Sequence, residues 1–293
     1  MRPPMKRLVK FVVLVLVAVF IAASLSAATP TPTPTLTASP TATATPTQVI
    51  CASISAPIAQ YGFNIGQETN DLSGNGNNLT MVGTVPQSTT IFREGNASAG
   101  PTWGGTNLFT VPSGAYIEGL AAFTVSCWYY NKSFSANQGI YSNYGASQYI
   151  ALCTQTGSPN LFGLYIQANN LATGTLPSAD NAWHRMTGVY DEGTSTIYWD
   201  GTQIANSSAM AAPTFTATGS QIGSVNGNGF WLYPTTYIDD FRIYNCALTS
   251  GQVAQLANLP APCPPNCGQQ PCYDLTRPTS GILDLTGASG GCM

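Results

Sequence analysis

Residues 195–204 read STIYWDGTQI, and this stretch decides the fold class. Two short runs rich in β-branched and aromatic side chains flank the pair Asp200-Gly201. An Asp-Gly pair suits the positive φ angles of a two-residue type I′ turn between antiparallel strands. The stretch therefore predicts a β-hairpin.

Further apolar runs, separated by Gly, Asn, Asp and Ser, lie on both sides of this hairpin, at 123–130, 148–152, 161–166, 186–190 and 237–245. In the first of them, alternate positions are apolar: Phe123, Val125, Cys127 and Tyr129 fall on one face. Only 248–256 has a helical pattern, and Thr249 and Gln252 are spaced like a capping box before it. Many short strands with one short C-terminal helix predict an all-β, antiparallel two-sheet sandwich.

Charged residues are scarce, because Asp, Glu, Lys and Arg make up 7% of the 293 residues, against about 25% in an ordinary soluble domain. Four of the nine basic residues lie in the first ten positions. Nucleic-acid binding needs clustered Lys and Arg, so this class of function is excluded. The remaining five basic and twelve acidic residues leave a charge of −7, which also excludes a basic membrane-surface patch.

The N-terminal segment has the layout of a secretory signal peptide at 1–28. A basic stretch ends at Lys10, residues 11–23 are almost all aliphatic, and Ser26-Ala27-Ala28 places small residues at a cleavage site before Thr29. The alternative is an uncleaved anchor, because the apolar stretch approaches the length of a membrane span. With the signal cleaved, we expect no membrane span and a secreted, extracellular or cell-surface protein.

The rest of the chain divides into three parts by composition. Residues 29–49 form a Thr/Pro-rich linker that cannot build a core and is expected to be an extended spacer. Residues 50–259 carry the strand pattern, and 260–293 are a Cys/Pro/Gly-rich tail. The tail holds Cys263, Cys267, Cys272 and Cys292, for which disulfides are favoured over zinc because the compartment oxidises thiols.

Four sequence motifs occur in order along residues 50–259: DLSGNGNN at 71–78, FTVSCW at 123–128, the set WH, GVYD and YWDG between 183 and 201, and IDDFRIYN at 238–245. Together they resemble the bacterial secreted laminin G-like domains of the concanavalin A-like lectin/glucanase superfamily. The resemblance implies a jelly-roll sandwich. Cys127 and Cys246 depart from the family pattern.

Such a fold hosts binding modules, glycoside hydrolases and structural proteins. Hydrolysis needs two carboxylates facing one sugar, yet no glutamate of this chain has an acid two positions away, and Asp239 and Asp240 are expected on opposite faces of a strand. The only histidine, His184, is expected to pack or to form hydrogen bonds. We therefore expect a non-enzymatic module that binds a glycan or a cell-surface protein. A structural or adhesive protein is the alternative, and a glycoside hydrolase is less favoured.

Candidate ligand-binding residues are aromatic rings in or beside Gly/Asn-rich segments, where a ring can stack on a sugar: Tyr141, Tyr144, Trp231, Tyr233 and Tyr237. The alternative for each ring is that it covers the edge of the sandwich.

A calcium site is suggested by the loop that starts at Asp71. Asp71, Ser73, Asn75 and Asn77 place side-chain oxygens at every second position, as at the start of an EF-hand loop. Val82 stands where an EF-hand has its bidentate glutamate, so an EF-hand is excluded. One carboxylate is too little charge for a divalent ion, so a second must come from elsewhere.

The family resemblance implies calcium between this loop and the strand that contains Asp239 and Asp240. Alternation along that strand places Asp239 on the face of Phe241, taken as the core face, where a lone carboxylate needs a partner. A structural calcium ion is therefore expected on Asp71 and Asp239, with Asp240, Asn75 and Asn77 as lesser candidates. The alternative is a plain turn in which Asp71 accepts hydrogen bonds from backbone amides and Asp239 is hydrogen-bonded nearby.

Eight cysteines allow 105 pairings, so their spacing alone selects none. The family places its first and last strands side by side and antiparallel, which implies a Cys51–Cys246 disulfide. Cys127 and Cys153 are expected on successive strands and form the second candidate pair.

Overall fold

A computed structural model describes residues 49–104, 106–131, 138–146, 148–154, 161–166, 170–176, 180–208, 212–225 and 230–258. The expected signal peptide, nearly all of the linker and the four tail cysteines lie outside these ranges. Within the described ranges, no helix is both long enough and apolar enough to cross a membrane.

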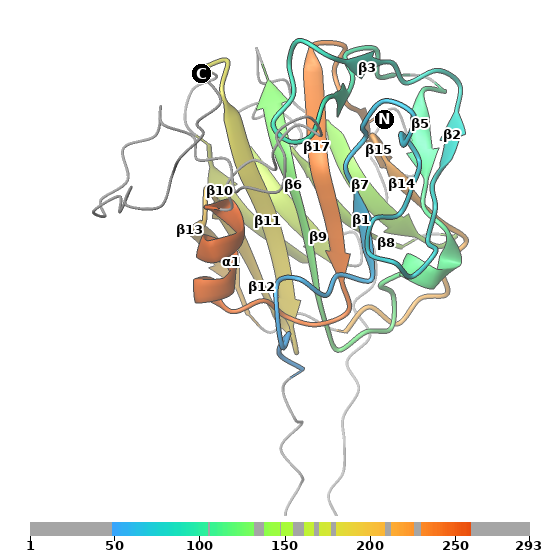
Figure 1. Cartoon of the computed structure of the whole chain (residues 1–293). Helices are drawn as coiled ribbons and strands as arrows, with labels where there is room; N and C mark the ends of the chain where they lie inside the picture. The colour runs from blue at the N-terminus through green and yellow to red at the C-terminus, as the bar shows by residue number, and fades with distance from the viewer. Residues whose placement is uncertain are drawn as a thin grey trace, which may run out of the picture. The chain divides into compact units, whose positions relative to one another are not determined.

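Two antiparallel sheets make up the fold, with one short α-helix (Figure 1). The first sheet has the strand order β13-β12-β11-β6-β17-β4-β3, and β1 also pairs with β17. Its strands are β1 (Ala59–Tyr61), β3 (Gln87–Ser88), β4 (Ser98–Ala99), β6 (Ala122–Asn131), β11 (Trp183–Asp191), β12 (Thr194–Trp199), β13 (Thr202–Ser207) and β17 (Thr236–Tyr244).

The second sheet has the order β10-β9-β8-β7-β14-β5-β2. Its strands are β2 (Thr80–Val82), β5 (Leu108–Thr110), β7 (Gly139–Tyr144), β8 (Tyr149–Thr154), β9 (Leu161–Ile166), β10 (Asn170–Thr175) and β14 (Gly219–Ile222). A separate pair joins β15 (Ser224–Val225) to β16 (Phe230–Trp231), and the helical elements are the 3₁₀ turn η1 (Ser113–Ala115) and α1 (Ser250–Ala257). The predicted all-β sandwich with one helix is confirmed.

Local sequence signals form as expected at two points. β12 and β13 are joined through Asp200 and Gly201, whose φ angles are +50° and +77°. Both are positive, as a type I′ turn requires. At α1, Thr249 caps the helix and Gln252 completes the capping box, because each side chain accepts a hydrogen bond from the other residue's backbone N–H.

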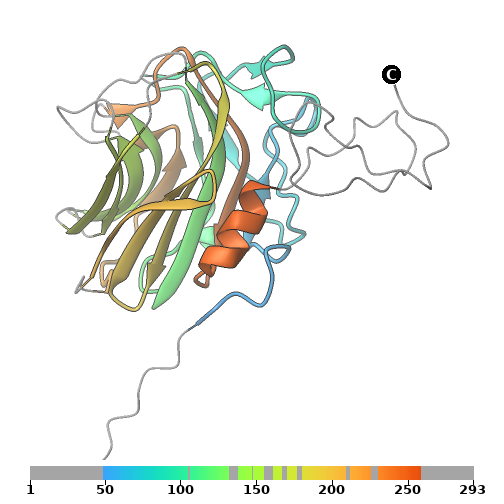
Figure 2. The same cartoon turned by 90° about the vertical axis from the view of Figure 1, so that its left-hand side faces the viewer.

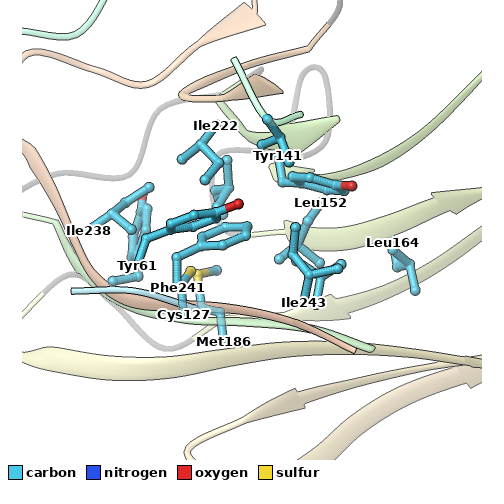
Figure 3. Packing of buried hydrophobic residues seen from close by; sticks show 14 of the residues in the cluster. Tyr61, Cys127, Tyr141, Leu152, Leu164, Met186, Ile222, Ile238, Phe241 and Ile243 are labelled. Atoms are coloured by element: carbon cyan, nitrogen blue, oxygen red, sulfur yellow. The ribbon is translucent and has the colours of Figure 1, made fainter. Parts of the chain in front are cut away.

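The core lies between the two sheets (Figures 2 and 3). The alternating face of β6 turns inward as predicted, with Phe123, Val125, Cys127 and Tyr129 at most 1% exposed. Figure 3 shows Cys127 and its neighbours on the first sheet opposite Leu152 of the second. Burial of these apolar side chains holds the two layers together.

The outer side of the first sheet is covered as well. In Figure 2, α1 lies on the side of this sheet that faces away from the second sheet. Val253 and Leu256 of α1 pack there with Tyr244 and Val189. β1 and β17 run antiparallel side by side, and a disulfide joins Cys51 to Cys246 next to them. The pairing that the family implied is confirmed.

The expected Cys127–Cys153 disulfide is wrong. β7 lies between the two strands in sequence, and Cys127 and Cys153 belong to different sheets. Cys127 faces the core, whereas Cys153 lies on the far face of the second sheet, because its neighbour Leu152 takes the inward position. Both thiols are free and buried, and burial raises the pKa of each to about 12, so both remain protonated.

Replacing both Cys51 and Cys246 by alanine should lower the free energy of unfolding by about 3–5 kcal/mol in the chain-entropy model. The disulfide spans 195 residues, so its loss frees a long loop in the unfolded chain. Urea denaturation with and without a reducing agent measures the effect. Wild type should weaken on reduction to the level of the double variant, whose own midpoint should not move. Equal stability of the oxidised wild type and the double variant would contradict the prediction.

Candidate functional site

A β-bulge in β17 sets the positions of two candidate calcium ligands. The register of β17 against β6 shifts between Asp239 and Arg242, and Asp240 has a φ angle of +38°. Ile238 and Phe241 both face the core, so the two aspartates between them lie on the outer side of the sheet. The predictions that Asp239 shares the face of Phe241, and that the two aspartates point to opposite faces, are therefore wrong.

Asp240 lies between two guanidinium groups. Its Oδ2 is 2.7 Å from Nη1 of Arg185, and its Oδ1 is 2.9 Å from Nε of Arg242. Arg185 is fully buried and Asp240 is 1% exposed. Burial raises the pKa of Asp240, but the two guanidinium groups outweigh it, and the pKa is lowered. The carboxylate is therefore ionised and neutralises buried positive charge.

Asp239 binds the loop between β3 and β4. Its Oδ2 accepts hydrogen bonds of 2.8 Å from the backbone N–H groups of Arg93 and Glu94. Glu94 in turn accepts a bond of 3.0 Å from Nε1 of Trp128, and the Arg93 guanidinium lies 4.4 Å from the centre of the Trp128 ring. Burial raises the pKa of Asp239 well above its usual value. Burial, and then the negative charge of Asp240, raise the pKa of Glu94 to about 6.

The loop after β1 is organised by Asp71. Its two carboxylate oxygens accept bonds from the backbone N–H groups of Gln60, Ser73 and Asn77 and from the Ser73 hydroxyl, at 2.8–2.9 Å. Asn75 and Asn77 both donate through their side-chain amides to the carbonyl of Ile58. Burial alone would raise the pKa of Asp71, but these hydrogen bonds lower it. The loop has the geometry of an Asx turn built on an ionised aspartate.

The carboxylates of Asp71, Asp239 and Asp240 each accept hydrogen bonds from groups of the protein itself. Gln60 connects two of them, because its N–H donates to Asp71 and its Nε2 donates to Asp240 at 2.8 Å. Across the part of the chain that the structure describes, no three His, Cys, Asp or Glu side chains converge as a metal site would require. A calcium ion would therefore have to share Asp71 with these donors, and calcium binding stays a prediction.

The outer face of the second sheet has a different character. On β8 and β9, Ile150, Leu152 and Leu164 point into the core, so Tyr149 and Tyr165 point outward. Tyr149 pairs across strands with Tyr144 at the end of β7. We call the partly exposed rings of Tyr144, Tyr149 and Tyr165, together with Gln221 and Thr110, the tyrosine face.

Neutral hydrogen-bonding groups accompany these rings. Nε2 of Gln221 donates to the Tyr144 hydroxyl at 3.0 Å, which leaves the hydroxyl hydrogen of Tyr144 free to donate to a ligand. Thr110 pairs with Gln221 on the next strand and continues the row across the sheet. Burial raises the pKa of all three tyrosines, that of Tyr165 to about 12, so their hydroxyls are neutral.

The β15–β16 pair borders this face. Val225 and Phe230 pack on Ala151 and Cys153 beside Tyr149 and Tyr165, whose ring centres are 6.3 Å apart. β15 can approach β7 closely because Gly139 has no side chain: a Cβ there would lie 2.5 Å from the backbone nitrogen of Val225. Two tilted phenol rings with a partly exposed Phe230 at their side suit a ligand with flat apolar patches and hydroxyl groups.

The predicted ligand-binding aromatics have different positions. Tyr141 lies in the core on β7 and is fully buried against Phe241, so its prediction as a surface ring is wrong (Figure 3). Tyr144 belongs to the tyrosine face. Trp231 is partly exposed in β16, and Tyr233 just after it is 46% exposed.

Tyr237 is 7% exposed and packs edge-on against Tyr130 of the first sheet. This is the alternative position expected of an edge ring. Tyr149 and Tyr165 were not predicted as binding residues. The available signal was alternation: Tyr149 is out of phase with Ile150 and Leu152, and Tyr165 is out of phase with Leu164 and Ile166.

His184 packs and forms hydrogen bonds, as expected. Its ring stacks on Trp199 at 4.3 Å, its Nδ1 is 2.7 Å from Asp200, and its Nε2 is 3.0 Å from Asp180. Burial lowers the pKa of His184, but the two carboxylates more than reverse this, so the pKa is raised. The histidine ties the β12–β13 turn to the start of β11.

A family model described as the concanavalin A-like lectin/glucanases superfamily, of the laminin G type, matches residues 103–254. The chain belongs to this superfamily. The first sheet also contains strands that precede the matched region, namely β1, β3 and β4.

Solved structures agree on the fold. Domain 4 of AbnA, an extracellular arabinanase from Geobacillus stearothermophilus solved with arabinotriose, has 21% identity and a TM-score of 0.54, and the match covers 69% of this chain and 98% of that one. The binding domain of botulinum neurotoxin serotype G has 16% identity and a TM-score of 0.56, with 69% and 50% covered.

A structure of botulinum neurotoxin type C, a toxin whose cell entry depends on interaction with two ganglioside molecules, has 16% identity and a TM-score of 0.52, with 69% and 51% covered. The chain thus spans about half the length of the toxin binding domains. No curated protein matches the sequence.

Replacing Glu94 by glutamine should flatten the pH dependence of stability between about pH 4.5 and pH 7. A carboxyl with a folded pKa of about 6 and an ordinary value of 4.5 stabilises the fold most below 4.5, and this stability is lost as the pH rises through 6. The loss amounts to about 1–2 kcal/mol in wild type, and glutamine keeps an oxygen acceptor for Trp128. Urea denaturation across this pH range measures it.

The matched control is Glu192→Gln, which removes an exposed carboxylate from the turn between β11 and β12. Its stability curve should run parallel to that of wild type. A Glu94→Gln curve parallel to wild type would contradict the assignment of the titrating group.

Calcium is predicted to raise the melting temperature of the protein, because a ligand that binds only the folded state stabilises it by linkage. Melts in calcium and in EDTA measure this. An Asp71→Asn variant should lose the difference. Equal midpoints for wild type, with no metal found by elemental analysis, would exclude the site.

Proposed function

We propose that this chain is a secreted, non-catalytic binding module whose tyrosine face binds carbohydrate. The observation that carries the proposal is the set of three partly exposed tyrosine rings on neighbouring strands of one sheet face, with the Gln221 amide and the Thr110 hydroxyl on the next two strands beside them. A sugar ring has an apolar C–H face that stacks on an aromatic ring and hydroxyls that pair with neutral polar groups. The tyrosine face offers both kinds of group side by side, with the rings on β9, β8 and β7 and the neutral polar side chains on β14 and β5.

The relatives support the same class of ligand. One similar structure is an arabinanase domain solved with arabinotriose, and another belongs to a toxin whose entry depends on gangliosides. Arabinotriose is a carbohydrate, and gangliosides carry carbohydrate. The expected signal peptide and the Cys51–Cys246 disulfide support secretion, because disulfides persist in oxidising compartments.

The non-catalytic part of the proposal rests on where the acids lie. Asp239, Asp240 and Glu94 are buried on the outer side of the first sheet and bonded to neighbouring groups. The strand residues of the tyrosine face, by contrast, are uncharged. A sugar bound there would meet no carboxylate from these strands, and glycoside hydrolysis needs two.

Replacing Tyr149 or Tyr165 by alanine should weaken glycan binding about tenfold each, since one stacking contact contributes on the order of 1–1.5 kcal/mol. A glycan array followed by calorimetry on the best ligand measures this. Tyr149→Phe should lose less than Tyr149→Ala, because the ring remains. The matched control is Phe92→Ala, which removes a 40%-exposed ring from the β3–β4 loop and should bind like wild type.

Thermal melts establish that each variant is folded. A wild-type protein that binds no glycan, or tyrosine variants that bind as tightly as Phe92→Ala, would contradict the proposal.

A further inference from the structure

The domain contains very few positive charges. Of the nine Lys and Arg residues in the chain, four lie in the first ten positions and one, Arg277, lies in the tail. Four remain for the whole of 49–258: Arg93, Lys132, Arg185 and Arg242. The same stretch contains ten Asp and Glu residues, so its balance is clearly negative.

Three of these four cations belong to the opposite layer of the sandwich. Arg185 and Arg242 are held by Asp240 on the outer side of the first sheet, and Arg93 lies over Trp128 there. Arg185 is fully buried and Arg242 is 8% exposed. Since both sheets and the core separate this layer from the tyrosine face, these guanidinium groups cannot contact a ligand bound there.

The strand residues of the tyrosine face add no charge of their own. Across strands, Tyr165 pairs with Ala151, Ala151 with Ser142, Ser142 with Gln221 and Gln221 with Thr110. Segments 155–160, 167–169 and 226–229, which follow β8, β9 and β15 in the sequence, contain no Asp, Glu, Lys or Arg, whereas 132–137, which precedes β7, contains Lys132. Lys132 is the remaining basic residue of the domain, and it lies outside the described residues.

An acidic sugar is a poor ligand for such a face. A carboxylate or sulfate that leaves water requires an opposite charge or several strong donors, and arginine is the usual partner. The tyrosine face offers phenols, an amide and a threonine hydroxyl, and the net negative charge of the domain repels anions. A neutral sugar incurs neither cost.

We propose that the ligand of the tyrosine face is a neutral glycan and that sialylated, sulfated and uronic-acid-containing glycans are excluded, because no described residue places a cation on this face. This inference rests on the proposed carbohydrate binding by the same face. It separates this chain from a ganglioside-dependent relative of the same fold, because gangliosides carry sialic acid.

The test uses the full chain on an array that carries neutral, sialylated and sulfated glycans, with arabinan and polygalacturonate compared in affinity gels. We expect at least one neutral glycan to bind, with unchanged affinity between low and high salt, and no acidic glycan to bind. Binding of an acidic glycan that is lost in Tyr149→Ala would overturn the neutral-ligand inference and leave the proposed function standing. The absence of any glycan binding would overturn both.

A charge variant tests the cause. Thr110→Arg adds a guanidinium to the tyrosine face and should produce retardation by polygalacturonate in low-salt gels where wild type shows none, through one exposed ion pair, with the retardation lost at high salt. The matched control is Thr202→Arg, which adds the same charge on exposed β13 of the other sheet. Equal retardation of both variants, or none of Thr110→Arg, would overturn the assignment of the missing cation as the cause.

Discussion

The rest of the structure depends on the Asp240 carboxylate, held between the guanidinium groups of Arg185 and Arg242. A buried guanidinium group without a counter-charge is strongly destabilising, so the fold needs a carboxylate at this point of the sheet. The bulge in β17 supplies this carboxylate, and the side-chain amide of Gln60, on the neighbouring strand β1, donates a hydrogen bond to it. Asp239 then anchors the β3–β4 loop beside it. The β3–β4 loop thereby covers part of the outer side of the first sheet.

The outer sides of the two sheets therefore differ in what covers them. The first sheet is covered on its outer side by the β3–β4 loop and α1, and it and this loop contain three of the four basic residues of 49–258. The second sheet is bordered by the β15–β16 pair and keeps its tyrosines partly exposed. The strands of this face carry uncharged, aromatic and hydroxyl side chains, and this is why we propose it as the binding site.

Local chemistry was readable from the sequence by itself. Alternation along β6 predicted that Cys127 and its in-phase neighbours face the core, because successive side chains of a strand point to opposite sides. Asp200-Gly201 predicted the turn, and Thr249 with Gln252 predicted the helix start, because each is a short-range conformational preference. The Cys51–Cys246 disulfide followed from a family resemblance that also identified the superfamily.

Tertiary structure alone decided what lies on each face. The bulge moved Asp239 away from the face that strict alternation assigns to it, because a single extra residue reverses the parity of a strand. Cys153 lies on a different sheet from Cys127. Tyr141 is in the core, whereas Tyr149 is partly exposed. All four residues have similar apolar neighbours in the sequence. Which side of a sheet becomes covered depends on segments far away in the chain, such as α1 and β15. Periodicity specifies that a strand has two faces, but only packing between distant segments specifies which one meets water.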